Sequence, residues 1–278
     1  MKENAIQRTE RIARKISTTV KFSGVSFDGE NFKFDFLKDS ENDIIKLAAY
    51  KLNTSKHSNN VYWFGYRFEP SSSSKQRTDF INYIKGTGSG RKISDSDLRK
   101  FIELPLNALS RLVSLYSINC TVYPISGRSQ LVSKMIKVIY DNTPHNANRC
   151  SFELVKKSPI EIEFDWDGFE MNFADNPNYG QMVEHVKEDI LPKIKRLDYF
   201  SLAHNVKPKY RPFIKNYLGF PDIERLEEFS KLKGENILIV DDINTSGSTL
   251  NEILRILNEV NNQCNIFIYT LIGKENGF

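Results

Sequence analysis

Two adjacent aspartates, Asp241 and Asp242, follow a run of apolar residues in the stretch NILIVDDINTSGSTL at 236–250. Like charges side by side are unfavourable unless a cation or a hydroxyl-rich ligand meets them. The acids therefore either sit at a solvated strand end or serve a ligand. Carboxylates accept hydrogen bonds from sugar hydroxyls and help to hold divalent metal ions, so these are the two chemistries to weigh.

A tract of small and hydroxyl-bearing residues follows the two aspartates. It leads into a segment with apolar residues at helical spacing, Leu250, Ile253, Leu254 and Leu257. The tract is therefore predicted to lie at the N-terminus of a helix, where backbone N–H groups and the helix dipole favour a phosphate. A glycine within it lets the backbone approach the ligand closely. The predicted phosphate-binding residues are Thr245, Ser246, Gly247, Ser248 and Thr249.

Phosphate on one side and vicinal hydroxyls on the other describe a ribose 5-phosphate. The stretch NILIVDDINTSGSTL resembles the phosphoribosyl-pyrophosphate (PRPP) signature of type I phosphoribosyltransferases, which has an apolar strand, two acids, two variable residues and a Thr/Ser-rich tract around a glycine. The resemblance implies that Asp241 and Asp242 act in catalysis by meeting the ribose 2- and 3-hydroxyls, and that residues 245–249 surround the 5-phosphate. An ordinary strand, turn and helix with a Ser/Thr cap is the alternative.

The same resemblance implies the partners of the site. PRPP is the expected donor, and Mg2+ is expected mainly through the substrate, near Asp241 and Asp242. A homodimer is expected as well. One departure bears on the acceptor: in family members that act on 6-oxopurines the phosphate tract begins with an Asp that serves as general base, whereas this chain has Thr245. A threonine has no useful basicity near neutral pH, so a 6-oxopurine acceptor is disfavoured.

A second strand-to-helix turn is predicted in TVYPISGRSQ at 121–130. The family resemblance implies that a short loop after the first core strand holds the pyrophosphate through backbone N–H groups and a basic side chain. A guanidinium suits a diphosphate because it binds two oxygens at once. The predicted pyrophosphate-binding residues are Ser126, Gly127, Arg128 and Ser129. A capping turn with a solvated arginine is the alternative.

The stretch NVKPKYRPFIKNY at 205–217 resembles the mobile loop that closes over the reacting centre in this family. Its basic residues would screen the departing pyrophosphate and help to exclude water; they are Lys207, Lys209, Arg211 and Lys215. Lys207, Lys209 and Arg211 are therefore predicted to be catalytic, and His204 at the edge of the loop is a candidate proton donor. A solvated surface loop is the alternative.

The elements that must position these residues change character near residue 118. Before it, VKFSGVSFDGENFKFDFL predicts a β-hairpin around Asp28, VYWFGYRF predicts a strand, and Pro105 is expected to begin a helix. From residue 119 on, strands alternate with helices. Strands are expected at SFELV (151–155), IEIEFDW (160–166) and FEMNF (169–173), and at YFSLAH (199–204). Such alternation predicts an α/β fold with a parallel twisted sheet and flanking helices, phosphoribosyltransferase-like over 118–278. Residues 1–117 are expected to be a separate α+β N-terminal region of unknown role.

Composition narrows the classes of partner. The chain has 278 residues and a net charge of +4, which is too small to imply nucleic acid or membrane binding by itself. No run approaches the roughly 20 apolar residues of a membrane span, and the N-terminal sequence lacks the apolar core of a secretory signal, so a cytoplasmic protein is expected. Cys120, Cys150 and Cys264 form no CxxC pattern and are expected to be buried free thiols.

Three functions are compatible with these residues. The first is a PRPP-dependent phosphoribosyltransferase acting on a nitrogen acceptor that the sequence does not identify. The second is a non-catalytic PRPP or nucleotide sensor that binds a partner through its N-terminal region. The third is a nucleic-acid-associated protein that uses the basic loop and an aromatic cluster more typical of a core or an interface, namely Tyr62, Trp63, Phe64 and Tyr66.

Overall fold

The computed structural model describes the chain over residues 24–28, 31–35, 48–51, 61–68, 73–86, 95–125, 129–143, 149–244 and 247–273. Five of the predicted site residues lie outside these ranges: Ser126, Gly127, Arg128, Thr245 and Ser246. Within the described ranges, no helix is long and apolar enough to cross a membrane.

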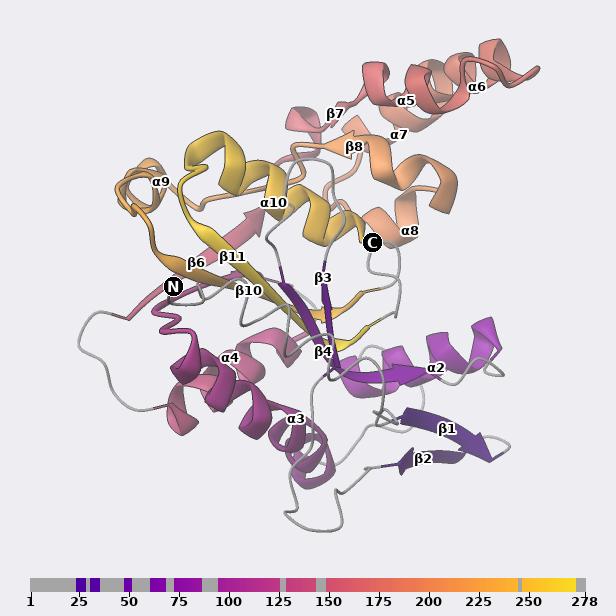
Figure 1. Ribbon diagram of the computed structural model, residues 1–278. Helices are drawn as coiled ribbons and strands as arrows, with labels where there is room; N and C mark the ends of the chain where they lie inside the picture. Colours follow the sequence, from indigo (N-terminus) through magenta and orange to yellow (C-terminus); the bar gives the residue numbers. More distant parts are fainter. Residues whose placement is uncertain are drawn as a thin grey trace.

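One large sheet runs through the molecule (Figure 1). Its centre is parallel, in the order β4, β11, β10, β5, β6, and β9 pairs antiparallel with β6. These strands are β4 (Val61–Phe68), β5 (Cys120–Pro124), β6 (Cys150–Lys156), β9 (Leu218–Gly219), β10 (Asn236–Ile243) and β11 (Asn265–Ile272). The predicted α/β fold with a parallel sheet is confirmed by this strand order.

The N-terminal region contributes directly to this sheet. β4 pairs along β11, with Trp63 opposite Tyr269, so the sheet crosses the boundary expected between residues 117 and 118. The predicted hairpin is present as β1 (Gly24–Asp28) and β2 (Asn31–Asp35), and β1 also pairs with β4. β3 (Ala48–Lys51) pairs antiparallel with β4.

Helices cover both faces of the sheet, which explains the nearly continuous apolar runs of the central strands. Along β10 the side chains alternate, so that Ile237 and Ile239 join the core on one face and Leu238 and Val240 join the core on the other. α9 and α10 lie on the first face, and α3 and α4 lie on the second (Figure 1). Their bounds are α3 (Asp95–Leu115), α4 (Leu131–Asn142), α9 (Ile223–Ser230) and α10 (Ser248–Val260).

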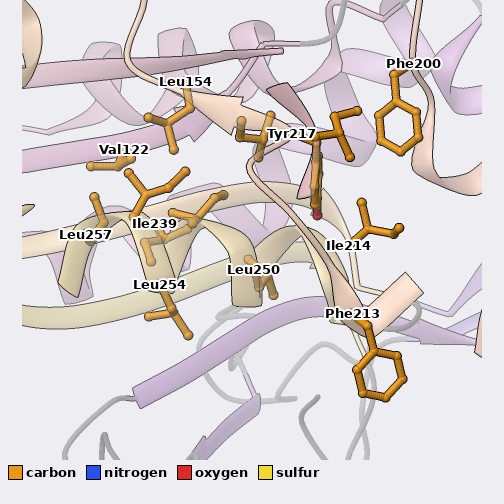
Figure 2. Packing of buried hydrophobic residues seen from close by; sticks show 14 of the residues in the cluster. Val122, Leu154, Phe200, Phe213, Ile214, Tyr217, Ile239, Leu250, Leu254 and Leu257 are labelled. Carbon is orange, nitrogen blue, oxygen red and sulfur yellow. The ribbon is translucent and has the colours of Figure 1, made fainter. Parts of the chain in front are cut away.

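The first of these cores surrounds α10. Figure 2 shows Ile239 of β10, Leu250 and Leu254 of α10, and Tyr217 among its buried side chains. Because Leu250 and Leu254 are four residues apart, they lie on one face of the helix and press it onto the sheet. This packing fixes where the N-terminus of α10 lies relative to the end of β10.

The aromatic residues of β4 belong to the core. Tyr62, Trp63, Phe64 and Tyr66 are all buried, which removes the exposed aromatic cluster on which the nucleic-acid hypothesis relied. All three cysteines are free; Cys120 is buried, as expected, whereas Cys150 and Cys264 are only partly buried.

α3 is a single helix of 21 residues with Pro105 inside it, so the prediction that Pro105 begins a helix is wrong. A proline in a helix interior leaves the carbonyl four residues earlier without its N–H donor. That carbonyl belongs to Phe101, and it accepts a 2.9 Å hydrogen bond from the Tyr66 hydroxyl. A tertiary contact from β4 therefore satisfies the group that the proline orphans.

Residues 159–215 form a lobe beside α10, at the upper right of Figure 1. Here two strand predictions are wrong, because α5 replaces the expected strand at 169–173 and α8 replaces the one at 199–204. The Asp165 side chain caps α5 at Gly168, and Phe169 is buried in the lobe. The elements are η1 (Pro159–Glu161), β7 (Glu163–Phe164), α5 (Trp166–Phe173), α6 (Tyr179–His185), η2 (Val186–Ile190), α7 (Leu191–Lys195), α8 (Leu202–Asn205), η3 (Pro208–Phe213) and β8 (Ile214–Lys215).

Candidate functional site

Asp241 and Asp242 lie at the C-terminal end of β10, beyond its last register pair with β5, Ile239 with Val122. They are only 6% and 7% exposed, respectively. The Asp242 N–H donates a 2.8 Å hydrogen bond to Asp241 Oδ1. Ligands of open α/β sheets bind at this end of the strands. Both aspartates are thus nearly buried at the ligand-binding edge of the sheet.

A lysine from the N-terminal region meets this acid pair. Lys85 is the last residue of α2 (Ser74–Lys85), and its Nζ lies 2.6 Å from Asp242 Oδ2. The two side chains are 27% and 10% exposed, so this ion pair is largely removed from water. An ammonium in this position balances part of the charge that two adjacent carboxylates bring together.

The electrostatics of the three groups are coupled through burial and charge. The pKa of Asp241 is raised to about 7, first by burial and then by the charge of Asp242, against the opposing effects of Lys85 and the Asp242 N–H. Burial lowers the pKa of Lys85, but the charge and hydrogen bond of Asp242, together with the charge of Asp241, raise it overall. Lys85 therefore stays a cation, and Asp241 loses its proton at a higher pH than an ordinary aspartate does.

The N-terminus of α10 follows the acids in the chain. Gly247 precedes the helix with a φ of 73°, a left-handed conformation that favours glycine. Ser248 is buried and begins the 13-residue helix, and Thr249 is half-buried. The Tyr217 hydroxyl donates a 2.8 Å hydrogen bond to the Ser248 carbonyl. The backbone N–H groups of a first helical turn are donors suited to a phosphate.

Residues 182–277 match the family model described as the phosphoribosyl transferase domain. This part of the chain is a phosphoribosyl transferase domain. The matched residues include both acids and α10, whereas Lys85 and the turn after β5 precede them in the chain. No curated protein sequence matches the chain.

Three solved structures illustrate what the chain is similar to. A hypoxanthine phosphoribosyltransferase from Staphylococcus aureus shares 15% identity, with 64% of this chain and 66% of that chain covered and a TM-score of 0.33. A hypoxanthine phosphoribosyl transferase from Trypanosoma cruzi shares 10% identity, with coverages of 68% and 71% and a TM-score of 0.36. A purine phosphoribosyltransferase from Pyrococcus horikoshii Ot3 shares 11% identity, with coverages of 64% and 86% and a TM-score of 0.32. The strand order of the sheet shows the fold independently of these likenesses.

The C-terminal ends of β5 and β10 lie at the same edge of the sheet, because the two strands are parallel neighbours. Of the four predicted pyrophosphate-binding residues, Ser129 is described. Its Oγ accepts a 3.2 Å hydrogen bond from the N–H of Leu131, the first residue of α4. This Ser129 contact is local to the start of α4, whose N-cap residue is Gln130, and a pyrophosphate role for the turn stays a prediction.

The basic segment at 205–217 is a short 3-10 helix, η3, followed by β8, rather than an open loop. Arg211 donates from Nε to the Val206 carbonyl over 2.8 Å and from Nη2 to the Ala203 carbonyl over 2.7 Å. Lys209 Nζ lies 4.7 Å from the centre of the Tyr210 ring. Arg211 is therefore engaged by the backbone of the preceding turn, whereas the exposed Lys209 lies only against the ring of its neighbour in the chain.

The remaining polar residues of this segment differ in their engagement. Lys215 pairs with Asp165 at 2.9 Å, which joins β8 to the start of α5. Lys207 and His204 are exposed. Among the described residues, no basic side chain of 205–217 contacts Asp241 or Asp242. A catalytic role for Lys207, Lys209 or Arg211 stays a prediction.

Sequence reasoning missed Lys85. It lies far from the phosphoribosyl transferase domain in the chain, and no local pattern connects it with the aspartates. The only available signal is generic: two buried carboxylates need a cation, which could come from any of 39 lysines and arginines. Helix α2 places this lysine next to Asp242 because the helix follows β4 in the same sheet.

Proposed function

We propose that the protein is a PRPP-dependent phosphoribosyltransferase that moves ribose 5-phosphate to a nitrogen acceptor and releases pyrophosphate. One observation carries the proposal: the buried carboxylates of Asp241 and Asp242 at the end of β10, followed directly by the N-terminus of α10, within a phosphoribosyl transferase domain. Carboxylates accept hydrogen bonds from hydroxyls, and a helix N-terminus binds phosphate, so the pair of features suits a ribose 5-phosphate.

The proposed reaction is a displacement at the anomeric carbon of PRPP. The bond from C1 to the pyrophosphate oxygen breaks, and its electron pair leaves with the pyrophosphate. The lone pair of the acceptor nitrogen forms the new bond to C1 from the opposite face, and the nitrogen then loses its proton. Positive charge develops on the ribose, so the protein contributes chiefly by fixing the geometry and by placing charge around the reacting centre.

The donor set fits a magnesium ion that arrives with the substrate. No group of three or more candidate metal ligands exists among the described residues, and Asp242 already pairs with Lys85. Mg2+ is commonly bound by one or two carboxylates together with substrate phosphates. Asp241 and Asp242 would therefore hold the ion jointly with PRPP, and the ion would neutralise charge on the departing pyrophosphate.

For the acceptor we propose a nucleobase other than a 6-oxopurine. The reason is the residue type at position 245, where a threonine offers no carboxylate to take a proton from a purine ring. An acceptor that loses its proton to water or to the leaving pyrophosphate needs no such base.

A second candidate function is a non-catalytic PRPP sensor. The observation that favours it is the engagement of Arg211 and Lys215 in the fold, the former with two carbonyls and the latter with Asp165. These residues were expected to screen the leaving pyrophosphate. A sensor needs the two aspartates and the N-terminus of α10 to bind PRPP. It does not need basic side chains that stabilise the departing pyrophosphate.

Calorimetric titration with PRPP, with and without Mg2+, tests the donor site that both functions share. We expect binding that Mg2+ strengthens and that Asp242→Asn weakens by tenfold or more, on the scale of a lost hydrogen bond to a charged group. Asp198→Asn is the matched control, because Asp198 is exposed and distant in the chain from the site. Absence of PRPP binding in both conditions would overturn the proposal and the sensor alike.

Pyrophosphate release then separates the enzyme from the sensor. Protein and PRPP are incubated with a panel of pyrimidine and purine bases, and released pyrophosphate is measured. Release that depends on one base, and that Asp241→Asn abolishes, supports the enzyme. PRPP binding without release across the panel would favour the sensor.

A further inference from the structure

Lys85 reaches the acid pair from outside the phosphoribosyl transferase domain. It ends helix α2, whereas the matched domain begins at residue 182. Its Nζ lies 2.6 Å from Asp242 Oδ2, and the exposed fractions of the two side chains are 27% and 10%. Fully exposed ion pairs contribute little because water and salt screen them. The Lys85–Asp242 pair is only partly exposed, so the attraction between its two charges is screened less.

Helix α2 is anchored so that Lys85 has little freedom. A capping box between Ser73 and Gln76 fixes its start, and Gly86 closes its end with a φ of 63°. Phe80 and Ile84 are buried in the core between α2 and α3, and the Phe80 ring lies edge-on to Phe101 at 5.9 Å. The residue after Ile84 is therefore set in place by its neighbour in the core.

The hydrogen bonds of the two acids leave a specific pair of oxygens. Asp241 Oδ1 accepts the N–H of Asp242, and Asp242 Oδ2 accepts Lys85. Among the described residues, Asp241 Oδ2 and Asp242 Oδ1 have no hydrogen-bond partner. Each carboxylate thus keeps one oxygen to accept one donor. One free acceptor oxygen on each of two consecutive residues suits the two neighbouring hydroxyls of a ribose, each of which donates one proton.

We propose that Lys85 is a positioning residue of the ribose site, which holds Asp242 so that one oxygen of each acid meets one hydroxyl of a 2,3-diol. The inference rests on the proposed function and adds a specificity to it. Lys85 makes the site selective for ribose 5-phosphates that carry both hydroxyls over those that lack the 2-hydroxyl. Without Lys85 the Asp242 carboxylate turns freely, and its oxygens no longer match the diol.

A lysine that only balances charge would behave differently. Loss of its positive charge would change the affinity for every anionic sugar phosphate by a similar factor, because the phosphate is common to all of them. Loss of a positioning contact changes the ratio of affinities between ligands with and without the 2-hydroxyl. This ratio is therefore the measurement that separates the two roles.

The test compares ribose 5-phosphate with 2-deoxyribose 5-phosphate by calorimetry on the full chain. We expect the unaltered protein to prefer ribose 5-phosphate by about tenfold or more, the scale of a hydrogen bond to a charged group. Lys85→Met should reduce the preference to about threefold or less. Lys75→Met is the matched control, because Lys75 is exposed in the first turn of the same helix, and it should leave the preference unchanged.

The outcomes distinguish the inference from the function beneath it. If the unaltered protein binds neither sugar phosphate nor PRPP, the proposed function fails. If it binds them with a clear preference for the diol and Lys85→Met keeps that preference, the role of Lys85 fails alone. Should Lys85→Met not fold, Lys85→Arg is measured, which keeps the charge but moves the donor atoms. A reduced preference in Lys85→Arg supports the inference, and an unchanged one overturns it.

Discussion

The hydroxyl of Tyr217 donates a 2.8 Å hydrogen bond to the carbonyl of Ser248, the first residue of α10. Tyr217 follows β8, the last element of the lobe at 159–215. The bond therefore joins the lobe to the N-terminus of α10, where the phosphate is proposed to bind. The Tyr217 ring belongs to the same buried cluster as Leu250 and Leu254 of α10 (Figure 2). The position of the helix N-terminus thus depends on a residue outside the signature.

Replacing Tyr217 by phenylalanine removes this bond while keeping the ring. We expect the free energy of unfolding to fall by about 1 kcal/mol, the usual contribution of a buried hydrogen bond. Urea unfolding measures it. Tyr210→Phe is the control, because Tyr210 is equally buried in the lobe and no hydrogen bond of its hydroxyl occurs in the described part of the chain. Equal losses in both variants would show that the Ser248 contact has no special weight.

The raised pKa of Asp241 predicts how the free energy of unfolding depends on pH. Its pKa is about 7 in the folded protein and near 3.8 when unfolded, so the folded state binds the proton more tightly. Stability from this group is therefore complete below about pH 4 and is lost as the pH rises toward 7. Asp241→Asn keeps an oxygen for the Asp242 N–H and removes the titration. Urea unfolding at pH 5 and pH 8 should show a smaller loss in Asp241→Asn than in the unaltered protein.

The control for this pH comparison is Asp198→Asn, which removes an exposed carboxylate. It should show the same loss between pH 5 and pH 8 as the unaltered protein, because other titrating groups act equally in both. An identical pH dependence in Asp241→Asn and Asp198→Asn would contradict the raised pKa of Asp241.

Gly247 is the residue of the signature whose backbone demands glycine. Its φ of 73° costs a residue with a Cβ about 1–2 kcal/mol, so Gly247→Ala should lower the free energy of unfolding by that amount. Gly180→Ala is the matched control: Gly180 lies in α6, and an added Cβ there would meet no atom within 4 Å. It should leave stability unchanged or raise it slightly. Comparable losses in both variants would argue against a conformational cause.

The parts of the fold that the sequence predicts are those determined by local pattern. The continuous apolar run at 237–240 predicts a buried strand, which is present as β10. The helical spacing of the apolar residues at 250–257 predicts a helix, which is present as α10. The place of the two acids at the end of the strand is also predictable, because strand, acids and helix follow one another directly in the sequence.

What the sequence could not predict depends on contacts between distant segments. Val61–Phe68 reads as a strand, but its place beside β11 follows from packing across the whole chain. The lysine that meets Asp242 is selected by the course of α2 after that strand. The expected strand at 199–204 is absent, and the chain forms a helical turn at Leu202–Asn205 instead. The Arg211 and Asn205 side chains bond to the backbone of this turn at Ala203 and Ser201.

Pro105 is a further case in which a contact between distant segments decides the local structure, and this contact can be tested. The carbonyl that Pro105 orphans, that of Phe101, accepts the Tyr66 hydroxyl at 2.9 Å. Tyr66→Phe should therefore cost about 1–2 kcal/mol of unfolding free energy in the natural background. Pro105→Ala supplies an N–H four residues after Phe101, so Tyr66→Phe should cost less in that background. A double-mutant cycle by urea unfolding measures the coupling, and equal costs in the two backgrounds would contradict the compensation.

The basic segment yields a prediction that separates structural residues from reactive ones. Arg211 donates to the Ala203 and Val206 carbonyls. Lys207 is exposed, and unlike Lys209 it has no cation–π contact with Tyr210. Arg211→Ala should lower the free energy of unfolding by about 1–3 kcal/mol, because two hydrogen bonds from a charged group are lost. Lys207→Ala should change it by less than about 0.5 kcal/mol.

Function should follow the opposite order if the segment screens pyrophosphate. Lys207→Ala should then lower the rate of pyrophosphate release with little change in PRPP affinity, because a cation that meets the leaving group acts mainly in the transition state. Single-turnover release and calorimetric PRPP titration measure the two quantities. A folded Lys207→Ala protein with an unchanged rate would remove the segment from the reaction. The site would then consist of the acid pair, the mouth of α10 and Lys85.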